Sequence, residues 1–229
     1  MWTRVEVKAK GKIGFKRNYW PCVLVALVLS LLMGSVVSTN INVNGSEGEF
    51  VTQNISWTFI GIVAVVGMLL VIFVFNVLEI GCRRFFLLNQ LQPAEMGEMA
   101  YGFKHNYQNN VIAQFMVTLY VCVGMLLLII PGLVMHYQYR MVPYILSERP
   151  ELSPSEVLAE SKKMMNGNKW DAFIYDLSFI GWDILGACTF GILNLFYVNP
   201  YVYASDAELY LTLRSLEINQ NAGQPNGIN

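Results

Sequence analysis

Long apolar runs alternate with short polar segments along the whole chain. Six of these runs hold about 15 to 25 residues each and few charged residues. A helix of about 20 mostly apolar residues spans the hydrocarbon core of a bilayer. The pattern therefore predicts an all-α fold, a polytopic membrane helix bundle with six transmembrane spans. The predicted spans are residues 20–37, 57–81, 111–130, 133–147, 172–189 and 192–213.

Residues 154–166 follow a different pattern, with apolar positions on one helical stripe and charged positions opposite. Ser153, Pro154 and Glu156 form a helix start with a capping box, and Gly167 is the expected stop. An amphipathic helix of this kind lies along the membrane surface. We therefore expect a cytoplasmic helix, with interface residues Lys162, Lys163, Lys169 and Trp170 in and just after it.

Pro131 and Gly132 separate the third and fourth runs and allow two interpretations. They form a helix turn between two spans, or they kink one long helix. With a turn, Arg140 is the only one of the 15 basic residues that lies inside a span, and the others face the cytoplasm. With a kink, Lys162 and its basic neighbours would lie outside, although Lys and Arg in short loops favour the cytoplasm. The turn is therefore favoured, with both termini cytoplasmic.

The basic residues also indicate the domain boundaries. Residues 1–19 hold six Lys and Arg residues and one Glu, which predicts a basic cytoplasmic N-terminus. The following run exceeds the 7–15 apolar residues typical of a signal peptide, so a retained first span is preferred to a cleaved leader. Arg83 and Arg84 mark the cytoplasmic end of the second span. A single membrane domain, residues 20–217, then precedes a flexible polar tail, residues 218–229.

The composition narrows the class of protein. Hydrophobic residues make up 55% of the chain and charged residues 14%, against about 25% charged residues in soluble domains. This balance excludes a soluble globular domain. The net charge of −1 argues against a nucleic-acid partner. The four cysteines stand singly, with no spacing that suits a metal.

Ionisable residues inside the predicted spans are the main candidates for a site, because such residues are costly in a membrane. Asp176 and Asp183 are seven residues apart, which places both on one face of a continuous helix. The interpretation stays open between a structural ion pair of Arg140 with one aspartate and a centre that binds a cation, a proton or an amine. The full candidate set is Arg140, Asp176, Asp183, Asp206, Asn199, Tyr137, Tyr203 and Tyr210.

Five segments resemble a known family: LIIPG (128–132), YRMVPYIL (139–146), SKKMMNGNKW (161–170), LSFIGW (177–182) and NPYVYASDAELY (199–210). The family is the bacterial integral-membrane group known as domain of unknown function 975. It is similar in turn to membrane domains found beside glycerophosphodiester phosphodiesterases. The resemblance implies a multi-helix membrane fold in a bacterial plasma membrane, and it brings no catalytic residues.

No motif for a catalytic serine, a zinc protease or a nucleotide phosphate occurs in the chain. We therefore predict a protein that is not an enzyme and has no catalytic residues, metal or cofactor. The leading hypothesis is an accessory, scaffold or regulatory subunit that contacts membrane lipids and another membrane protein. The alternative is a small transporter or exporter that uses the intramembrane Asp and Arg residues. The oligomeric state stays open.

Overall fold

The computed structural model describes residues 2–37 and 57–222, and these residues form helices and short connections without a β-strand. The all-α prediction is confirmed for this part of the chain. Residues 38–56, which connect the first two predicted spans, lie outside it. The elements are α1 (Arg4–Arg17), α2 (Tyr19–Val37), α3 (Trp57–Leu70), η1 (Val71–Phe75), α4 (Asn76–Leu91), η2 (Met96–Ala100), α5 (Tyr101–Lys104), α6 (Tyr107–Leu127), α7 (Ile129–Gln138), α8 (Val142–Glu148), α9 (Pro154–Met164), α10 (Lys169–Leu177), α11 (Ile180–Cys188), η3 (Asn194–Val198) and α12 (Asn199–Ala222).

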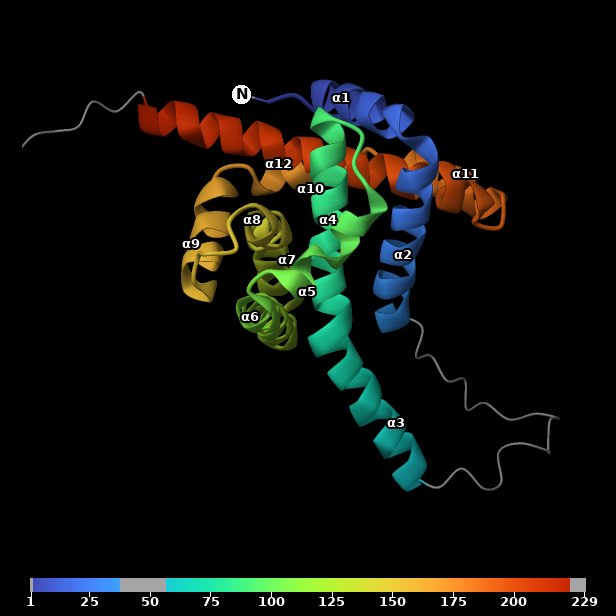
Figure 1. Cartoon of the computed structure of the whole chain (residues 1–229), viewed down its shortest axis with the longest axis vertical. Coiled ribbons are helices and arrows are strands. Elements are labelled where there is room, and N and C mark those ends of the chain that lie inside the picture. The colour runs from blue at the N-terminus through green and yellow to red at the C-terminus, as the bar shows by residue number, and fades with distance from the viewer. Residues whose placement is uncertain (1, 38–56, 223–229) are drawn as a thin grey trace, which may run out of the picture.

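Helices α3 and α4 form one long rod, joined through the π-helical turn η1. Every residue from 61 to 70 is exposed, and α3 projects away from the other helices (Figure 1). The α4 half is packed inside the molecule, with Val77, Ile80 and Phe85 fully buried. The rod continues to Leu91, ten residues beyond the predicted end of the second span. Arg83 and Arg84 are therefore part of a packed helix that continues past the predicted end of the second span.

Helices α6 and α7 form a hairpin. The chain reverses at Leu128, which has an extended backbone with φ −161° and ψ 147°. Gly132 packs so closely that a Cβ there would lie 2.5 Å from Cγ of Met125. The turn interpretation is thus correct, but Pro131 and Gly132 lie in the first turn of α7 rather than in the turn itself. Proline is tolerated there because the first amides of a helix have no intrahelical acceptor.

The fourth, fifth and sixth predicted spans are each interrupted. The fourth divides into α7 and α8 at residues 139–141, and the fifth divides into α10 and α11 at residues 178–179. The sixth begins with the π-helical turn η3, which ends directly before Asn199 and Pro200. Kinks in helices are common at prolines, which lack a backbone N–H donor, and at π-helical turns. Helix α12 then runs to Ala222, so the predicted flexible tail is helical as far as that residue.

The basic N-terminal segment is itself a helix. Helix α1 is bent by 109° from α2 and packs along α12. The contact is close, because a Cβ added to Gly11 would lie 2.5 Å from Cα of Ser205. Figure 1 shows that α12 crosses α4 at a steep angle and that α6 and α7 are seen almost along their axes. The helices are therefore stacked crosswise, not aligned in a parallel bundle.

Two segments of the described chain are long and apolar enough to cross a membrane. They are Gly61–Leu91 and Tyr107–Leu127, and the bent pair of α1 with the first part of α2 would add a third if it counts as one span. This test considers length and composition alone. It supports the predicted membrane association. It identifies two or three segments, fewer than the six predicted spans.

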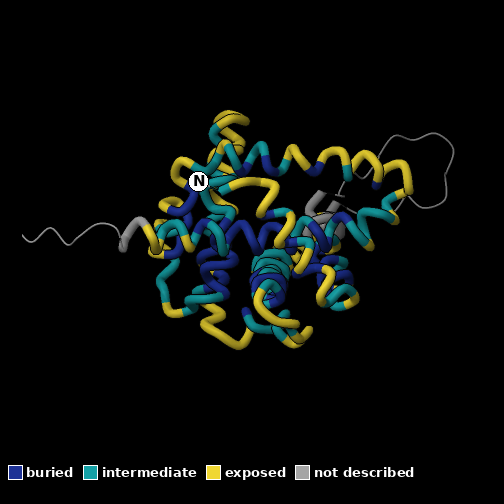
Figure 2. The backbone as a smooth tube through the Cα atoms, turned by 90° about the horizontal axis from the view of Figure 1, so that it is seen from above, coloured by how far each residue is buried: buried dark blue, intermediate teal, exposed yellow. Residues whose placement is uncertain are grey.

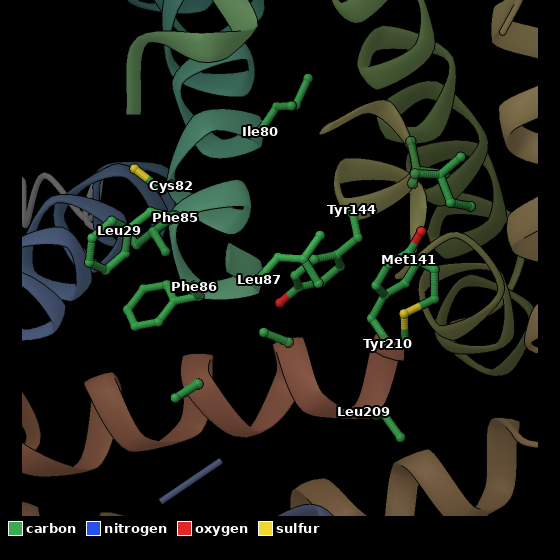
Figure 3. Close-up of a cluster of buried hydrophobic side chains, with 14 of the residues drawn as sticks. Leu29, Ile80, Cys82, Phe85, Phe86, Leu87, Met141, Tyr144, Leu209 and Tyr210 are labelled. Atoms are coloured by element: carbon green, nitrogen blue, oxygen red, sulfur yellow. The ribbon is translucent and has the colours of Figure 1, made fainter. Parts of the chain in front are cut away.

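The core lies where α4, α8 and α12 meet. Figure 2 shows the buried residues gathered in the middle of the molecule and the exposed ones at its periphery. Tyr144 of α8 stacks on Tyr210 of α12, with ring centroids 5.2 Å apart and planes at 15° (Figure 3). Phe85 and Phe86 of α4 lie at the other end of this cluster, also facing α12. Ionisable side chains on these helices are therefore surrounded by packed apolar side chains.

Helix α9 begins as predicted, with Pro154 at its first turn and a complete capping box between Ser153 and Glu156. Hydrogen bonds from the Ser153 hydroxyl and from its backbone amide lower the pKa of Glu156. Because the folded pKa lies below the unfolded value of about 4.3, this carboxylate stabilises the start of α9 above that pH. The stabilisation is lost as the pH falls through the lowered pKa.

We expect amide hydrogen exchange in the first turn of α9, corrected for its intrinsic pH dependence, to accelerate as the pH falls below about 4. Hydrogen exchange with mass spectrometry measures this on the protein in detergent. In Glu156→Gln the corrected rate should not change with pH over the same interval. An unchanged acceleration in that variant would assign the effect to another group.

Candidate functional site

Arg140 is at the centre of the site. It lies in the break between α7 and α8, where the chain leaves helical geometry at Tyr139 and resumes it at Val142. Its Nη1 donates to Oδ2 of Asp176 at 2.8 Å, and its Nη2 donates to Oδ1 of the same carboxylate at 2.9 Å. Nη2 also donates to Oδ1 of Asp206 at 2.8 Å. One guanidinium therefore joins α10 to α12 through a bidentate and a single ion pair.

A second arginine extends this network from α4. Arg83 Nη1 donates to Oδ2 of Asp206 at 3.3 Å, and Arg83 Nε donates to Oε1 of Glu79 at 3.3 Å. The same Nη1 lies 3.3 Å from the Tyr144 hydroxyl, to which it donates. Asp206 thus receives hydrogen bonds from two arginines on two different elements. We call the five ionisable residues Glu79, Arg83, Arg140, Asp176 and Asp206 the polar centre.

Tyrosine hydroxyls complete the contacts of the polar centre. Tyr137 donates to Oδ2 of Asp176 at 2.8 Å, and Tyr175 donates to Oδ1 of Asp206 at 3.3 Å. The ring of Tyr203 faces the Arg83 guanidinium, 5.2 Å from its centroid. Charge-assisted hydrogen bonds such as these are stronger than neutral ones. They hold both carboxylates in fixed positions.

The members of the polar centre differ in their exposure. The Asp206 side chain is 9% exposed and that of Arg140 is 14% exposed, whereas that of Asp176 is 37% exposed. Three carboxylates meet two guanidinium groups, so the ionised network carries one net negative charge. Asp176 is the most exposed member of the polar centre.

Three predicted members of the site lie elsewhere. Asp183 is exposed on α11, because the break at residues 178–179 separates it from the face of Asp176. Asn199 donates to the Ser30 hydroxyl of α2 at 2.8 Å. Tyr210 donates to Oε2 of Glu148 at 2.7 Å, in a cluster with Arg214. The prediction that these residues converge with Arg140 is therefore corrected.

Sequence reasoning missed two of the five members of the polar centre, Glu79 and Arg83. Arg83 was assigned to the cytoplasmic end of a span and Glu79 was not among the candidates, although their side chains are only 14% and 15% exposed. Their spacing of four residues on a helix was the available signal, since such a pair lies on one face. Tyr144 and Tyr175 carried no signal of their own, because aromatic residues are common in any apolar run.

The predicted interface lysines are largely engaged within the protein. Lys163 Nζ lies 2.9 Å from Oε1 of Glu217 on α12, and Lys169 Nζ donates to Oε1 of Gln138 at 3.3 Å. Lys162 and Trp170 are exposed. Helix α9 therefore attaches to α12 and retains a smaller free basic face than predicted.

Within the described residues, no three His, Cys, Asp or Glu side chains gather in a way that suits a metal ion. No curated protein and no solved structure matches the chain. The model of one protein family does match, and it covers residues 5–217, nearly the whole chain including every member of the polar centre. The chain therefore belongs to the family described as protein of unknown function DUF975.

Proposed function

We propose that this protein is a non-enzymatic integral membrane protein of the bacterial plasma membrane, acting as an accessory, scaffold or regulatory subunit. The observation that carries the proposal is that Arg140 is paired with Asp176 and Asp206 at once. A group engaged on both sides by the protein's own carboxylates has a structural role in joining helices. The likeness to phosphodiesterase-associated membrane domains remains a prediction and contributes nothing here.

The second candidate is a small transporter or exporter. Two observations favour it over an enzyme: the surplus carboxylate of the polar centre and the partial exposure of Asp176. A carboxylate that is both fixed and accessible is suited to a proton or a small cation. The accessory role is preferred because Arg140 and Tyr137 already occupy both oxygens of Asp176.

Flux through reconstituted protein separates the two candidates. The full chain is placed in liposomes that contain a pH-sensitive dye, and a proton or potassium gradient is applied across the membrane. The accessory role predicts the same slow leak for the natural protein, for Asp176→Asn and for protein-free liposomes. A flux that exceeds the leak and that Asp176→Asn abolishes would overturn the proposal in favour of transport.

Six crossings with cytoplasmic termini are part of the proposal. The charge distribution supports them, and the first half of the chain supplies the two long apolar segments. The second half would cross through interrupted helices, and the steep angle between α12 and α4 argues against a crossing by α12 parallel to α4. In this topology the connection at Phe190 and Gly191, between α11 and η3, faces outward. Phe190 is almost fully exposed and has a left-handed backbone, as expected of a tight turn.

Cysteine labelling tests this topology. On a background without the four natural cysteines, Lys162→Cys should resist a membrane-impermeant maleimide in intact cells, and Phe190→Cys should react with it. Both positions are exposed in the folded protein, so each is a control for the accessibility of the other. Labelling of Lys162→Cys before cell lysis would contradict the predicted orientation.

A further inference from the structure

A hollow of about 520 Å³ lies between the N-terminal helix α1 and helix α10, outside the polar centre. Trp2, Arg4 and Lys8 line it on one side, and Asp171 and Ser178 line it on the other. Its volume is within the range of about 300–1,000 Å³ that is usual for ligand sites. The hollow is therefore large enough for a small polar group with part of an apolar chain.

The walls of the hollow are held at both ends of α10. The Trp2 indole Nε1 donates to Oδ1 of Asn168, just before α10, at 3.1 Å. Lys8 Nζ donates to the backbone carbonyl of Ser178, just after α10, at 2.9 Å, and it lies 3.7 Å from the centroid of the Phe179 ring. The space between these two attachments is thus preformed by the fold. A preformed site loses little free energy through ordering when it binds.

The charges around the hollow favour an anion. Arg4 and Lys8 face a single acid, Asp171, which leaves one net positive charge. Burial, together with the neighbouring Arg4, lowers the pKa of Lys8, and a bound anion would relieve this repulsion. An arginine beside a lysine is a common arrangement for binding phosphate.

The surroundings of the hollow point to a lipid and not to a free anion. Trp2 and Val5 add apolar surface to its lining, and Val5 is largely exposed. Helix α1 leads through a sharp bend into α2, the first predicted span, which would place α1 at the level of the lipid headgroups. Tryptophan beside basic residues is typical of that level. We propose that this hollow binds the phosphate-bearing headgroup of an anionic phospholipid.

The test uses the full chain in a non-ionic detergent and measures binding of phosphatidylglycerol by native mass spectrometry. Zwitterionic phosphatidylcholine, which has no net charge, is the comparison and should bind more weakly. Arg4→Gln should weaken phosphatidylglycerol binding about tenfold. Asp171→Asn should strengthen it, because the only acid of the hollow is then removed. Lys16→Gln is the matched control: it removes one charge from an exposed position of the same helix that does not line the hollow. That variant should bind as the natural protein does.

Equal weakening in Arg4→Gln and Lys16→Gln would show general attraction to a basic helix and would overturn the proposal. Stronger binding in Asp171→Asn cannot come from a damaged fold, because damage lowers affinity. Weaker or unchanged binding in this variant, with the same unfolding transition as the natural protein, would overturn the proposal too. Inorganic phosphate supplies the third arm of the test. If it displaces phosphatidylglycerol at equal concentration, the hollow is a site for free phosphate and not for a lipid headgroup. None of these results depends on the flux measurement.

Discussion

Replacing Arg140 with alanine is expected to destabilise the folded protein by about 3–5 kcal/mol, because one partner of a buried charge network is removed. The substitution leaves Asp176 without its bidentate partner, and Asp206 keeps Arg83 as its remaining arginine. The free energy of unfolding can be measured in mixed detergent and sodium dodecyl sulfate micelles. Because Arg140 joins the α7–α8 break to α10 and α12, the loss should appear as a shift of the whole transition.

Double-mutant cycles measure how strongly Arg140 is coupled to each aspartate. We expect a coupling of about 1–3 kcal/mol between Arg140→Ala and Asp176→Asn, because the two residues touch. Asp206→Asn should also couple to Arg140→Ala. This substitution removes the ion pair with Arg83 as well, because Arg83 shares that carboxylate. Asp183→Asn is the matched control, because Asp183 is exposed on α11 and should couple within error of zero. Zero coupling for both Asp176 and Asp206 would contradict a structural role of the polar centre.

Gly81→Ala is expected to cost about 3 kcal/mol, at the upper end of the range for added volume in a packed core. A Cβ at Gly81 would overlap the carbonyl oxygen of Met99 in η2, and a backbone atom cannot move aside as a flexible side chain can. Gly102 makes a similar approach to α4, since its Cβ would lie 2.5 Å from the carbonyl oxygen of Val77. The segment from η2 to α5 therefore packs backbone to backbone on α4.

Arg84 shows why this segment cannot shift to make room. Its Nε donates to Oε2 of Glu98 at 2.8 Å, and its guanidinium carbon lies 3.8 Å from the centroid of the Tyr101 ring. Gly67→Ala is the matched control, because Gly67 belongs to the same rod and has nothing within 4 Å of its added Cβ. That variant should be neutral or stabilised by up to about 1 kcal/mol from helix propensity. Equal effects of the two variants in the same unfolding assay would contradict the packing argument.

Local pattern was sufficient to predict that the chain is helical, but not where several of its helices break. The apolar runs predicted an all-α fold, and Ser153, Pro154 and Glu156 predicted where α9 begins. The reversal between the third and fourth runs was correctly inferred from charge, although its position at Leu128 was not. These features depend on residues close together in the sequence, whose hydrogen bonds and charges need no distant partner.

The membership of the polar centre was decided by tertiary structure. Asp176 and Asp183 share a helical face only if their helix is continuous, and the break at residues 178–179 removes this condition. Lys8 of α1, 170 residues away in sequence, donates to the carbonyl of Ser178 at that break. Arg83 enters the centre because α4 is buried between α8 and α12, where its charge can be paired. Sequence spacing thus determined which residues can share a helix face, and only packing between distant helices determined which charges meet, because an ionised group is stable in the core only beside its partner.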